Sequence, residues 1–396
     1  MVESRYNFRF AVDGEPYVYN TLTGALWQGE LKEQSETVEA GFYTADREAE
    51  LQGLLEAVRA NITDASKAQD VTLVMTEACN FQCIYCYQDR APRNWNSETT
   101  EKFVAFARRL YEQGLAKLRV HYFGGEPLLN LPAMKELHTL LSALAKEYNA
   151  EYIPMITTNG SLLTEEVLRL FNFKVLQLTL DGQGEVHNRL RRSNLLDYEA
   201  TLDKIALVLS HPQTQMRVRF NLCVENKHSF YGVIDDFLRR GFPLEKIHFV
   251  INPLRKFRGT EPFTQLSPEG FAEARTAIRR HMQRAGAKMR YPRALPQPCA
   301  FSTGKALCLD TALEPAFCTS STEFPDGHRA TTTEHFRPGC GVLNLRKPCG
   351  GCTYLPLCLG GCGILQPGEG ACCDERYTLA EDLSDFIRRP HEWSVS

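Results

Sequence analysis

Between residues 71 and 285 of this 396-residue chain, short apolar segments alternate with longer amphipathic segments. Short runs rich in β-branched residues predict strands, and apolar residues every three to four positions predict helices. Strands that alternate with helices favour a parallel sheet with the helices packed outside it. The predicted strands span 71–76, 118–123, 152–158, 175–180, 216–224 and 246–252, and the predicted helices span 98–113, 131–148, 164–172, 195–210, 229–240 and 267–285. The sequence therefore predicts an α/β fold with six strand–helix units.

Three cysteines follow the first predicted strand in the run CNFQCIYC, where Cys79, Cys83 and Cys86 have C-x3-C-x2-C spacing. A structural zinc ion takes four ligands, usually from C-x2-C pairs. Three thiolates on a four-iron cluster instead leave one iron open to another molecule. The run therefore predicts an iron–sulfur cluster with an open iron, and a zinc site or a redox-active cysteine cluster is the alternative.

Further distinctive segments come at the ends of the next three predicted strands. The sequence GGEP (124–127) follows the second strand, TTNG (157–160) ends the third, and Asp181-Gly182 ends the fourth. In a barrel of parallel strands, the carboxyl ends of the strands meet at one edge, where active sites are built. We therefore expect these segments and the three cysteines to form a single site.

The cysteine run resembles the signature of radical S-adenosylmethionine (SAM) enzymes, including the aromatic Tyr85 before the third cysteine. The resemblance implies that Cys79, Cys83 and Cys86 hold a [4Fe–4S] cluster and that SAM binds its open iron. In that family, an electron from the cluster cleaves SAM into methionine and a 5′-deoxyadenosyl radical. The radical then abstracts a hydrogen atom from the substrate, so the cofactor carries the difficult chemistry.

The same resemblance implies a set of SAM-binding residues. The GGEP segment matches the family segment that binds the amino group of SAM through backbone carbonyls and the acidic side chain. TTNG and TLDG look like segments that line the SAM site, and Arg219 matches an arginine that pairs with the methionine carboxylate. His187 and Arg189 match the DG-x4-H-x-R run of peptide- and sulfatase-modifying members. The predicted SAM-binding residues are Gly124, Gly125, Glu126, Pro127, Thr158, Asn159, Thr179, Asp181 and Arg219.

A second group of cysteines lies between residues 299 and 373 and includes the run CGGCTYLPLCLGGC. Four closely spaced thiols could hold one zinc ion. The pattern also resembles the SPASM domain, a C-terminal extension of radical SAM enzymes that binds up to two auxiliary [4Fe–4S] clusters. The resemblance implies one cluster on Cys299, Cys318 and Cys362, and another on Cys349, Cys352, Cys358 and either Cys372 or Cys373.

Two features depart from the fuller SPASM pattern. Leu313 occupies a position that is usually glycine, and no cysteine lies five or six residues after Cys299. Cys308 or Cys340 could supply the fourth ligand of the first auxiliary cluster, or that iron could be open to the substrate. Cys308 lies in the apolar stretch KALCL, which also fits a small core residue.

We expect three domains. Residues 1–65 form an N-terminal α+β unit, 66–290 form a partial (β/α)6 TIM-like barrel, and 291–396 form a Cys-rich iron–sulfur domain with a C-terminal helix. The N-terminal unit combines strand-like segments around Asp13-Gly14 with a helix. Such a unit either packs onto the main domain or recognises a peptide by strand addition.

Composition excludes several classes of partner. The net charge is −3, and no block of Lys or Arg stands out, so the sequence predicts binding to neither nucleic acid nor an anionic membrane. No apolar run is long enough to span a bilayer, and the N-terminus lacks the pattern of a signal peptide, which predicts a cytoplasmic protein.

The predicted activity is the oxidative modification of a ribosomally made precursor peptide, giving a thioether, a carbon crosslink or a related product. An external electron donor such as flavodoxin or ferredoxin would reduce the cluster. One alternative is an anaerobic sulfatase maturase that forms formylglycine. Such enzymes usually place an aspartate directly after a SPASM cysteine, whereas Thr319 follows Cys318 here. Another alternative is a non-catalytic zinc or iron–sulfur protein. No residue spacing identifies a catalytic acid or base.

Overall fold

The structure is a computed structural model that describes residues 1–63, 67–88, 90–254, 263–287, 289–295, 299–301, 306–316, 318–319, 347–360 and 375–394. These residues form two compact units. The first comprises 1–65, 268–304 and 339–396, and the second, here called the sheet unit, comprises 66–267 and 305–338. No helix among the described residues is both long enough and apolar enough to cross a bilayer.

The sheet unit is built on six parallel strands that follow one another in chain order across the sheet. They are β6 (Ala68–Thr76), β7 (Lys117–Gly124), β8 (Glu151–Thr158), β9 (Val175–Leu180), β10 (Gln215–Leu222) and β11 (Ile247–Pro253). This arrangement confirms the predicted parallel sheet, and each strand lies within about three residues of its predicted range. Sequential order is expected when each crossover helix returns the chain to the next position.

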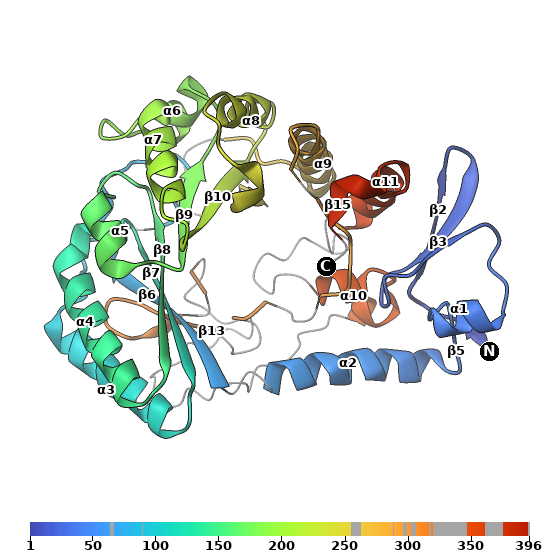
Figure 1. Ribbon diagram of the computed structural model, residues 1–396, viewed down its shortest axis with the longest axis horizontal. Helices are drawn as coiled ribbons and strands as arrows, with labels where there is room; N and C mark the ends of the chain where they lie inside the picture. The colour runs from blue at the N-terminus through green and yellow to red at the C-terminus, as the bar shows by residue number, and fades with distance from the viewer. Residues whose placement is uncertain are drawn as a thin grey trace. The chain divides into compact units, whose positions relative to one another are not determined.

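Helices cover one face of this sheet (Figure 1). They are α3 (Ser97–Glu112), α4 (Leu131–Glu147), α5 (Glu165–Phe171), α6 (Glu185–Arg191), α7 (Tyr198–Leu209) and α8 (Ser229–Arg239). Polar side chains fix several of the starts, because Asn96, Thr164 and Asp197 each accept a hydrogen bond from a backbone N–H in the first turn. The short helix α6 was not predicted from the sequence.

Alternate residues of each strand face opposite sides of the sheet. On β7, Leu118, Val120 and Tyr122 are fully buried, and the Tyr122 ring contacts Phe171 of α5. The residues between them are only partly buried, and the same alternation continues along β8, β9 and β10. The face opposite the helices, called here the inner face, therefore remains partly accessible to solvent.

Two short strands that the sequence analysis missed extend the sheet beyond β6. Strand β13 (Ala306–Leu309) runs parallel to β6, and β14 (Pro315–Ala316) runs antiparallel to β13. The Asp310 side chain organises the turn between them by accepting hydrogen bonds from the backbone of Ala312 and Glu314, both at 2.8 Å. Leu313 in this turn has a φ of 66°, which is the conformation that glycine adopts most readily.

The other unit contains the N-terminal and C-terminal segments. Its elements are β1 (Val2–Glu3), β2 (Asn7–Val12), β3 (Glu15–Asn20), β4 (Leu26–Gln28), α1 (Ser35–Glu39), β5 (Tyr43–Thr44), α2 (Arg47–Thr63), α9 (Pro268–Arg284), β12 (Met289–Arg290), α10 (Leu355–Cys358), α11 (Glu375–Arg388) and β15 (Trp393–Ser394). Strands β2, β3 and β4 form an antiparallel sheet, and Asp13 and Gly14 at the predicted β2–β3 turn both have positive φ.

Hydrophobic contacts join distant parts of the chain within this unit. Leu51, Leu54 and Val58 of α2 pack in one cluster with Leu355 and Leu359, more than 290 residues later. The predicted sixth helix, α9, lies against α11 in this unit (Figure 1). Ion pairs of Arg279 with Asp382 at 3.2 Å and Arg280 with Asp385 at 2.6 Å accompany that packing. The three predicted domains, 1–65, 66–290 and 291–396, stay a prediction.

Replacing Leu178 of β9, which is fully buried beneath the helices, by alanine removes apolar contacts and leaves a cavity. We expect the Leu178→Ala substitution to lower the free energy of unfolding by about 2–5 kcal/mol. Leu170→Ala on α5, where the side chain is 42% exposed, is the matched control, with an expected change within about 0.5 kcal/mol. Urea denaturation followed by circular dichroism measures both, and equal effects would contradict the burial pattern.

Candidate functional site

The three cysteines of the first run lie on the loop that follows β6, called here the cysteine loop (77–86). The Phe81 backbone N–H donates to the Cys79 sulfur at 3.5 Å, and the Cys86 N–H donates to the Cys83 carbonyl at 3.2 Å. Phe81 packs in one apolar cluster with all three cysteines and Leu196. All three cysteines thus lie on one loop and contact one apolar cluster, while no three Cys, His, Asp or Glu side chains of the described residues are grouped closely enough to hold a metal ion. Their role as cluster ligands stays a prediction.

Burial raises the pKa of Cys79, and it raises the pKa of Cys83 to about 11. The charge of Arg191 opposes both shifts, while the neighbouring cysteines add to them. The thiols of Cys79 and Cys83 would therefore be mostly protonated without a metal. Because a bound cation stabilises thiolates, the loop would exchange protons for iron on assembly.

The GGEP segment pairs with the backbone that enters the cysteine loop. Gly125 N–H donates to the Thr76 carbonyl at 2.8 Å, and Glu126 N–H donates to the Ala78 carbonyl at 2.9 Å. A Cβ atom on Gly124 or Gly125 would lie closer to these carbonyl oxygens than van der Waals contact allows. Gly124 also has a φ of 146°. Glycine is therefore required at both positions by this close backbone approach.

Glu126 is fully buried and connects the ends of β7 and β8. Its carboxylate accepts hydrogen bonds from the Thr158 hydroxyl at 2.6 Å, the Asn159 backbone at 2.7 Å and the Leu128 backbone at 3.1 Å. Burial raises the pKa of Glu126, and these three donors counteract that rise. Most of its acceptor capacity is thus used within the chain, and its predicted contact with the SAM amino group stays a prediction. Pro127 begins the short helix η2 (Pro127–Asn130) behind it.

A ring of hydrogen bonds connects the TTNG segment to the cysteine loop. Asn159 donates to the Asn80 side chain at 2.8 Å, Asn80 donates to the Ser161 hydroxyl at 2.9 Å, and Ser161 donates back to Asn159 at 2.7 Å. Asn80 lies directly after Cys79. Sequence reasoning missed Asn80 and Ser161, although their positions beside predicted site residues were an available signal.

Asp181, at the end of β9, lies in a buried polar network. Its carboxylate accepts hydrogen bonds from the Tyr85 hydroxyl and from Asn221, the latter at 3.0 Å. Arg191 donates to the Tyr85 hydroxyl at 2.8 Å and lies 3.7 Å from the Asp181 carboxylate. Burial raises the pKa of Asp181, and Arg191, Tyr85 and Asn221 oppose that rise. Asp181 therefore holds the aromatic residue of the cysteine loop.

Arg191 and Asn221 were not predicted from the sequence. Arg191 lies four residues after His187 on α6, so the two side chains share one face of the helix, and both are buried. Arg191 Nε and His187 Nε2 have no hydrogen-bond partner among the described residues. Buried polar groups are rarely left unsatisfied, so these two atoms are candidates to contact a bound molecule.

Arg219 and Thr179 face each other across β10 and β9, near the strand ends that carry the other predicted residues. Arg219 Nε donates to the Asn221 side chain at 2.7 Å, which connects Arg219 to Asp181 through one amide. The structure thus brings Thr179, Asp181 and Arg219 together. Their roles in binding SAM stay predictions.

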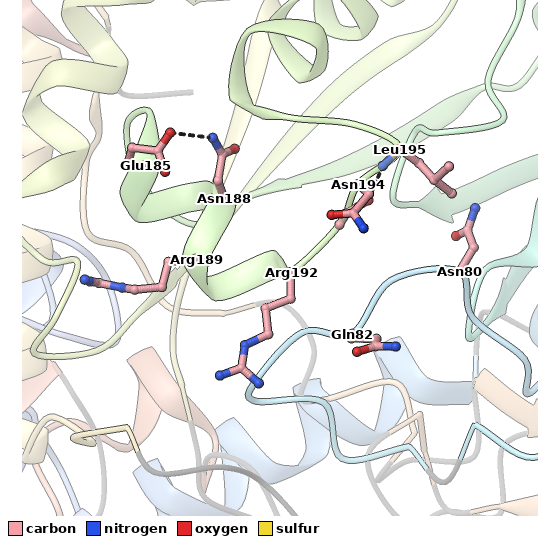
Figure 2. A pocket seen from close by; sticks show the side chains of 9 residues that line it. Asn80, Gln82, Glu185, Asn188, Arg189, Arg192, Asn194 and Leu195 are labelled. Carbon is pink, nitrogen blue, oxygen red and sulfur yellow. Dashed lines mark hydrogen bonds between the residues drawn. The ribbon is translucent and has the colours of Figure 1, made fainter.

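A pocket of about 670 Å³ lies beside the cysteine loop (Figure 2). Its lining is polar and comes from that loop and from α6 and the segment after it, namely Asn80, Gln82, Glu185, Asn188, Arg189, Arg192, Ser193, Asn194 and Leu195. Arg189, from the DG-x4-H-x-R match, lies in this exposed lining, whereas His187 of the same match is buried.

The described cysteines of the second group are divided between the two units. Cys349, Cys352 and Cys358 lie on one short segment, and the Cys352 N–H donates to the Cys349 carbonyl at 3.1 Å. Cys299 is exposed in the same unit, whereas Cys308 and Cys318 belong to the sheet unit. Cys340, Cys362, Cys372 and Cys373 lie outside the described residues. The auxiliary ligand sets therefore stay predictions.

Comparison with known protein families identifies the domain that contains the first cysteine run. Residues 73–212 match the model of the Radical SAM superfamily. This segment is a radical SAM domain. It contains Cys79, Cys83, Cys86, the GGEP and TTNG segments and Asp181, so the family resemblance inferred from the sequence is confirmed for this part of the chain.

Curated relatives match the chain over part of their length. The GTP 3′,8-cyclase of Campylobacter lari is 31% identical over 129 residues, which are 31% of this chain and 38% of the relative. The GTP 3′,8-cyclase of Xanthomonas axonopodis pv. citri is 25% identical over 191 residues, 46% of this chain and 55% of the relative. The chain thus spans well under two thirds of these relatives.

Solved structures match over most of the chain at low sequence identity. AnSMEcpe with bound AdoMet and the Cp18Cys peptide aligns with a TM-score of 0.60 and 17% identity, covering 82% of this chain and 98% of that one. Streptococcus suis SuiB bound to the precursor peptide SuiA aligns with a TM-score of 0.52 and 12% identity, covering 91% and 95%. At these identities the likeness shows a shared fold.

A radical SAM domain implies a [4Fe–4S] cluster and SAM, and the residues present fit both. Three cysteines lie on one loop, which is the number of thiolates that leaves one iron of a four-iron cluster open. The paired glycines let the GGEP backbone lie against that loop, and two buried nitrogen atoms, Arg191 Nε and His187 Nε2, lack hydrogen-bond partners among the described residues. The type and number of the donors thus agree with the implied cluster.

Gly125→Ala places a methyl group against the Ala78 carbonyl and should push the GGEP segment away from the cysteine loop. We expect the variant to lose most of the iron that a Cys79→Ala/Cys83→Ala/Cys86→Ala variant loses. Iron analysis after anaerobic reconstitution measures this. Gly53→Ala in α2, where the added methyl group meets open space, is the control and should keep wild-type iron. Full iron retention in Gly125→Ala would contradict the close-approach argument.

His187 accepts a hydrogen bond from the Asp181 N–H at 3.2 Å, and burial lowers its pKa from 6.5 to about 3. In the unfolded chain His187 binds a proton below pH 6.5, whereas the folded chain does not, so stability falls as pH drops from 6.5 towards 3. The free energy of unfolding should fall by about 2 kcal/mol between pH 6.5 and pH 5. His187→Gln should remove this part of the dependence.

The measurement is urea denaturation of the cluster-free wild type and the His187→Gln variant at pH 7.5 and pH 5. The destabilisation caused by the substitution should shrink at pH 5, because the wild type alone loses the histidine contribution. A constant difference between the two proteins would mean that His187 titrates normally in the folded state.

Proposed function

We propose that this chain is a radical SAM enzyme that oxidatively modifies a ribosomally made peptide, by forming a thioether, a carbon crosslink or a related product. The observation that carries the proposal is the convergence of three thiols, the glycine pair and the buried Asp181 network at one edge of the sheet. The radical SAM domain covers this edge.

When bound, the cluster and SAM would supply a 5′-deoxyadenosyl radical that removes a hydrogen atom from the substrate. Cys79, Cys83 and Cys86 would hold the cluster, and the carbonyl groups beside Gly124 and Gly125 would accept from the SAM amino group. These roles are supported by the close approach of the two backbones. Holding reactants in one orientation and keeping water away is the protein's part of such chemistry.

The polar network has a positioning role in this proposal. Arg191 and Asp181 hold the Tyr85 hydroxyl, which fixes the last turn of the cysteine loop. The Arg191 guanidinium also lies over the Phe81 ring, 5.2 Å from its centre. With these contacts at both ends, the loop would need little rearrangement when the cofactors bind. Arg219 and Thr179 would complete the site on the neighbouring strands.

A peptide substrate is supported by the solved structures with the same fold, in which SuiB and anSMEcpe are bound to peptides. Those peptides are ligands of those proteins. In this chain, the antiparallel sheet β2–β3–β4 ends at the three-residue strand β4, whose outer edge pairs with no further strand of the described chain. We propose that this edge recognises part of the precursor by strand addition.

The second cysteine group would hold one or two auxiliary [4Fe–4S] clusters that accept the electron left on the substrate. The grouping of Cys349, Cys352 and Cys358 on one segment supports the second ligand set. Leu313 supports the first, because its φ of 66° reproduces the backbone conformation that a glycine would allow. A flavodoxin- or ferredoxin-type protein would deliver the first electron.

The alternative is a sulfatase maturase that forms formylglycine, which the shared fold with anSMEcpe favours. Against it, Thr319 follows Cys318 in place of the aspartate that such enzymes usually carry. The two activities differ in the product. Conversion of a cysteine or serine in a sulfatase peptide to formylglycine would support the alternative.

Under a strong reductant, the reconstituted wild type should cleave SAM and release 5′-deoxyadenosine, measured by chromatography. The Cys79→Ala/Cys83→Ala/Cys86→Ala variant should release no more than a protein-free blank. Cys223→Ala is the control, because Cys223 is a buried core cysteine that packs with Leu254 and Phe263 beneath the cysteine loop and is not among the predicted ligands, and it should retain cleavage. A wild type that binds zinc and cleaves no SAM would make the chain a non-catalytic metal protein.

The substrate is tested by co-expressing the wild type with peptides encoded near its gene and measuring their mass. A loss of about two mass units fits crosslinking. Deleting residues 1–65 is a poor probe of recognition, because Leu54 and Val58 belong to the core of their unit. Replacing the exposed Gln28 of β4 by proline instead blocks strand addition, because the N–H of Gln28 faces away from β3, and it should abolish modification while 5′-deoxyadenosine release persists.

A further inference from the structure

The inner face of the sheet carries a row of polar side chains that the SAM site does not use. In the strand registers, Thr157 of β8 lies opposite Gln177 of β9, and Gln177 lies opposite Arg217 of β10. His121 of β7 joins the row, since its Nε2 lies 2.8 Å from the Thr157 hydroxyl. Gln177 donates to the same hydroxyl at 3.4 Å. We call Thr157, Gln177 and Arg217, with His121, the inner-face row.

These side chains are partly accessible. All four residues are partly buried, whereas their neighbours on the helix-covered face, such as Leu176 and Val218, are fully buried. A molecule on the inner face could therefore contact the row without displacing the core.

Arg217 lacks a counter-charge in the part of the chain that the structure describes. Its Nε is buried without a hydrogen-bond partner among the described residues, and its Nη2 donates to the Gln215 side chain at 3.3 Å. Burial lowers the pKa of Arg217, and no carboxylate opposes that effect. Partly burying a cation with neither an ion pair nor a full set of acceptors costs free energy, and such a group is stabilised when an anion binds.

The other two arginines on this face are engaged. Arg119 forms an ion pair with Asp70 at 2.6 Å. Arg219 donates to Asn221 at 2.7 Å and its charge acts on Asp181. Among the described residues of the inner face, Arg217 is therefore the arginine that is available to bind an external anion.

We propose that Arg217, Gln177 and Thr157 form a subsite that binds a carboxylate of the substrate peptide. This inference rests on the proposed function, because it names a chemical feature of that substrate. A planar guanidinium and a neighbouring amide match the two oxygens of a carboxylate. One positive charge with neutral donors suits a single negative charge, and a nucleoside triphosphate would need several cations.

The position of the subsite relates it to the SAM site. Arg217 precedes Arg219 by two residues on the same face of β10, a separation of about 7 Å along the strand. A peptide whose acidic group pairs with Arg217 would thus lie next to the predicted SAM-binding residues. The carboxylate would fix which residue of the peptide is presented for hydrogen abstraction.

The test uses the reconstituted, SAM-loaded enzyme and two blocked pentapeptides, four alanines around a central glutamate or a central glutamine. Binding at millimolar concentration is measured by saturation-transfer NMR. The glutamate peptide should bind about tenfold more tightly, as one charge-assisted hydrogen-bonded pair predicts. Arg217→Gln should abolish this preference. Arg169→Gln on α5, whose side chain is 75% exposed, should keep it.

Equal binding of both peptides to the wild type, or a preference that survives in Arg217→Gln, would overturn the proposal. GTP is the third probe, and Arg217-dependent binding of GTP that exceeds the glutamate peptide would assign the subsite to phosphate. Retained iron content and an unchanged melting temperature show that Arg217→Gln is folded. Release of 5′-deoxyadenosine by the wild type distinguishes failure of the subsite from failure of the proposed function. If the wild type releases none, the proposed function itself fails.

Discussion

The site depends on the close contact between the end of β7 and the backbone that leaves β6. The β6–β7 register shifts between Val74 and Thr76, so Thr76 pairs with Gly124 at the last position of the ladder. Such a bulge bends the strand and redirects the residues after it. The chain can then turn into the cysteine loop while Gly125 and Glu126 still bond to it. Further contacts, of Asn80 with Asn159 and of Tyr85 with Asp181, then hold the loop.

Buried charges hold the surrounding loops. Glu126 and Asp181 are fully buried, and each is satisfied by donors from segments far apart in the sequence. Breaking such a network leaves a buried charge without partners, which is strongly destabilising. The same networks therefore define one arrangement of the loops, because alternatives would leave a carboxylate unsatisfied. Beside these networks, Arg191 Nε and His187 Nε2 have no hydrogen-bond partner among the described residues and are candidates to contact a ligand.

Local patterns in the sequence predicted the six parallel strands and the helices between them, because apolar periodicity reports which face of a segment is buried. Long-range features were missed. Strand β13 pairs with β6 more than 230 residues earlier, and no local pattern encodes that partner. Helix α9 has a clear amphipathic pattern, but the pattern does not say that its partner is α11. The motifs located Asp181 and Glu126, whereas Arg191 and Asn221 are recognisable only by their burial in space.

The order in which the two units fold during synthesis follows from the positions of their packing partners in the sequence. The core that contains Leu54 of α2 also contains Leu355 and Leu359, so α2 lacks these packing partners until residue 359 has left the ribosome. The six parallel strands are complete at residue 253, and their own edge is covered by β13 some fifty residues later. The sheet unit can thus fold while the N-terminal segment is still without its partner. Cys79, Cys83 and Cys86 can accordingly reach their folded surroundings during translation, whereas the segment that holds Cys349 and Cys352 is synthesised later.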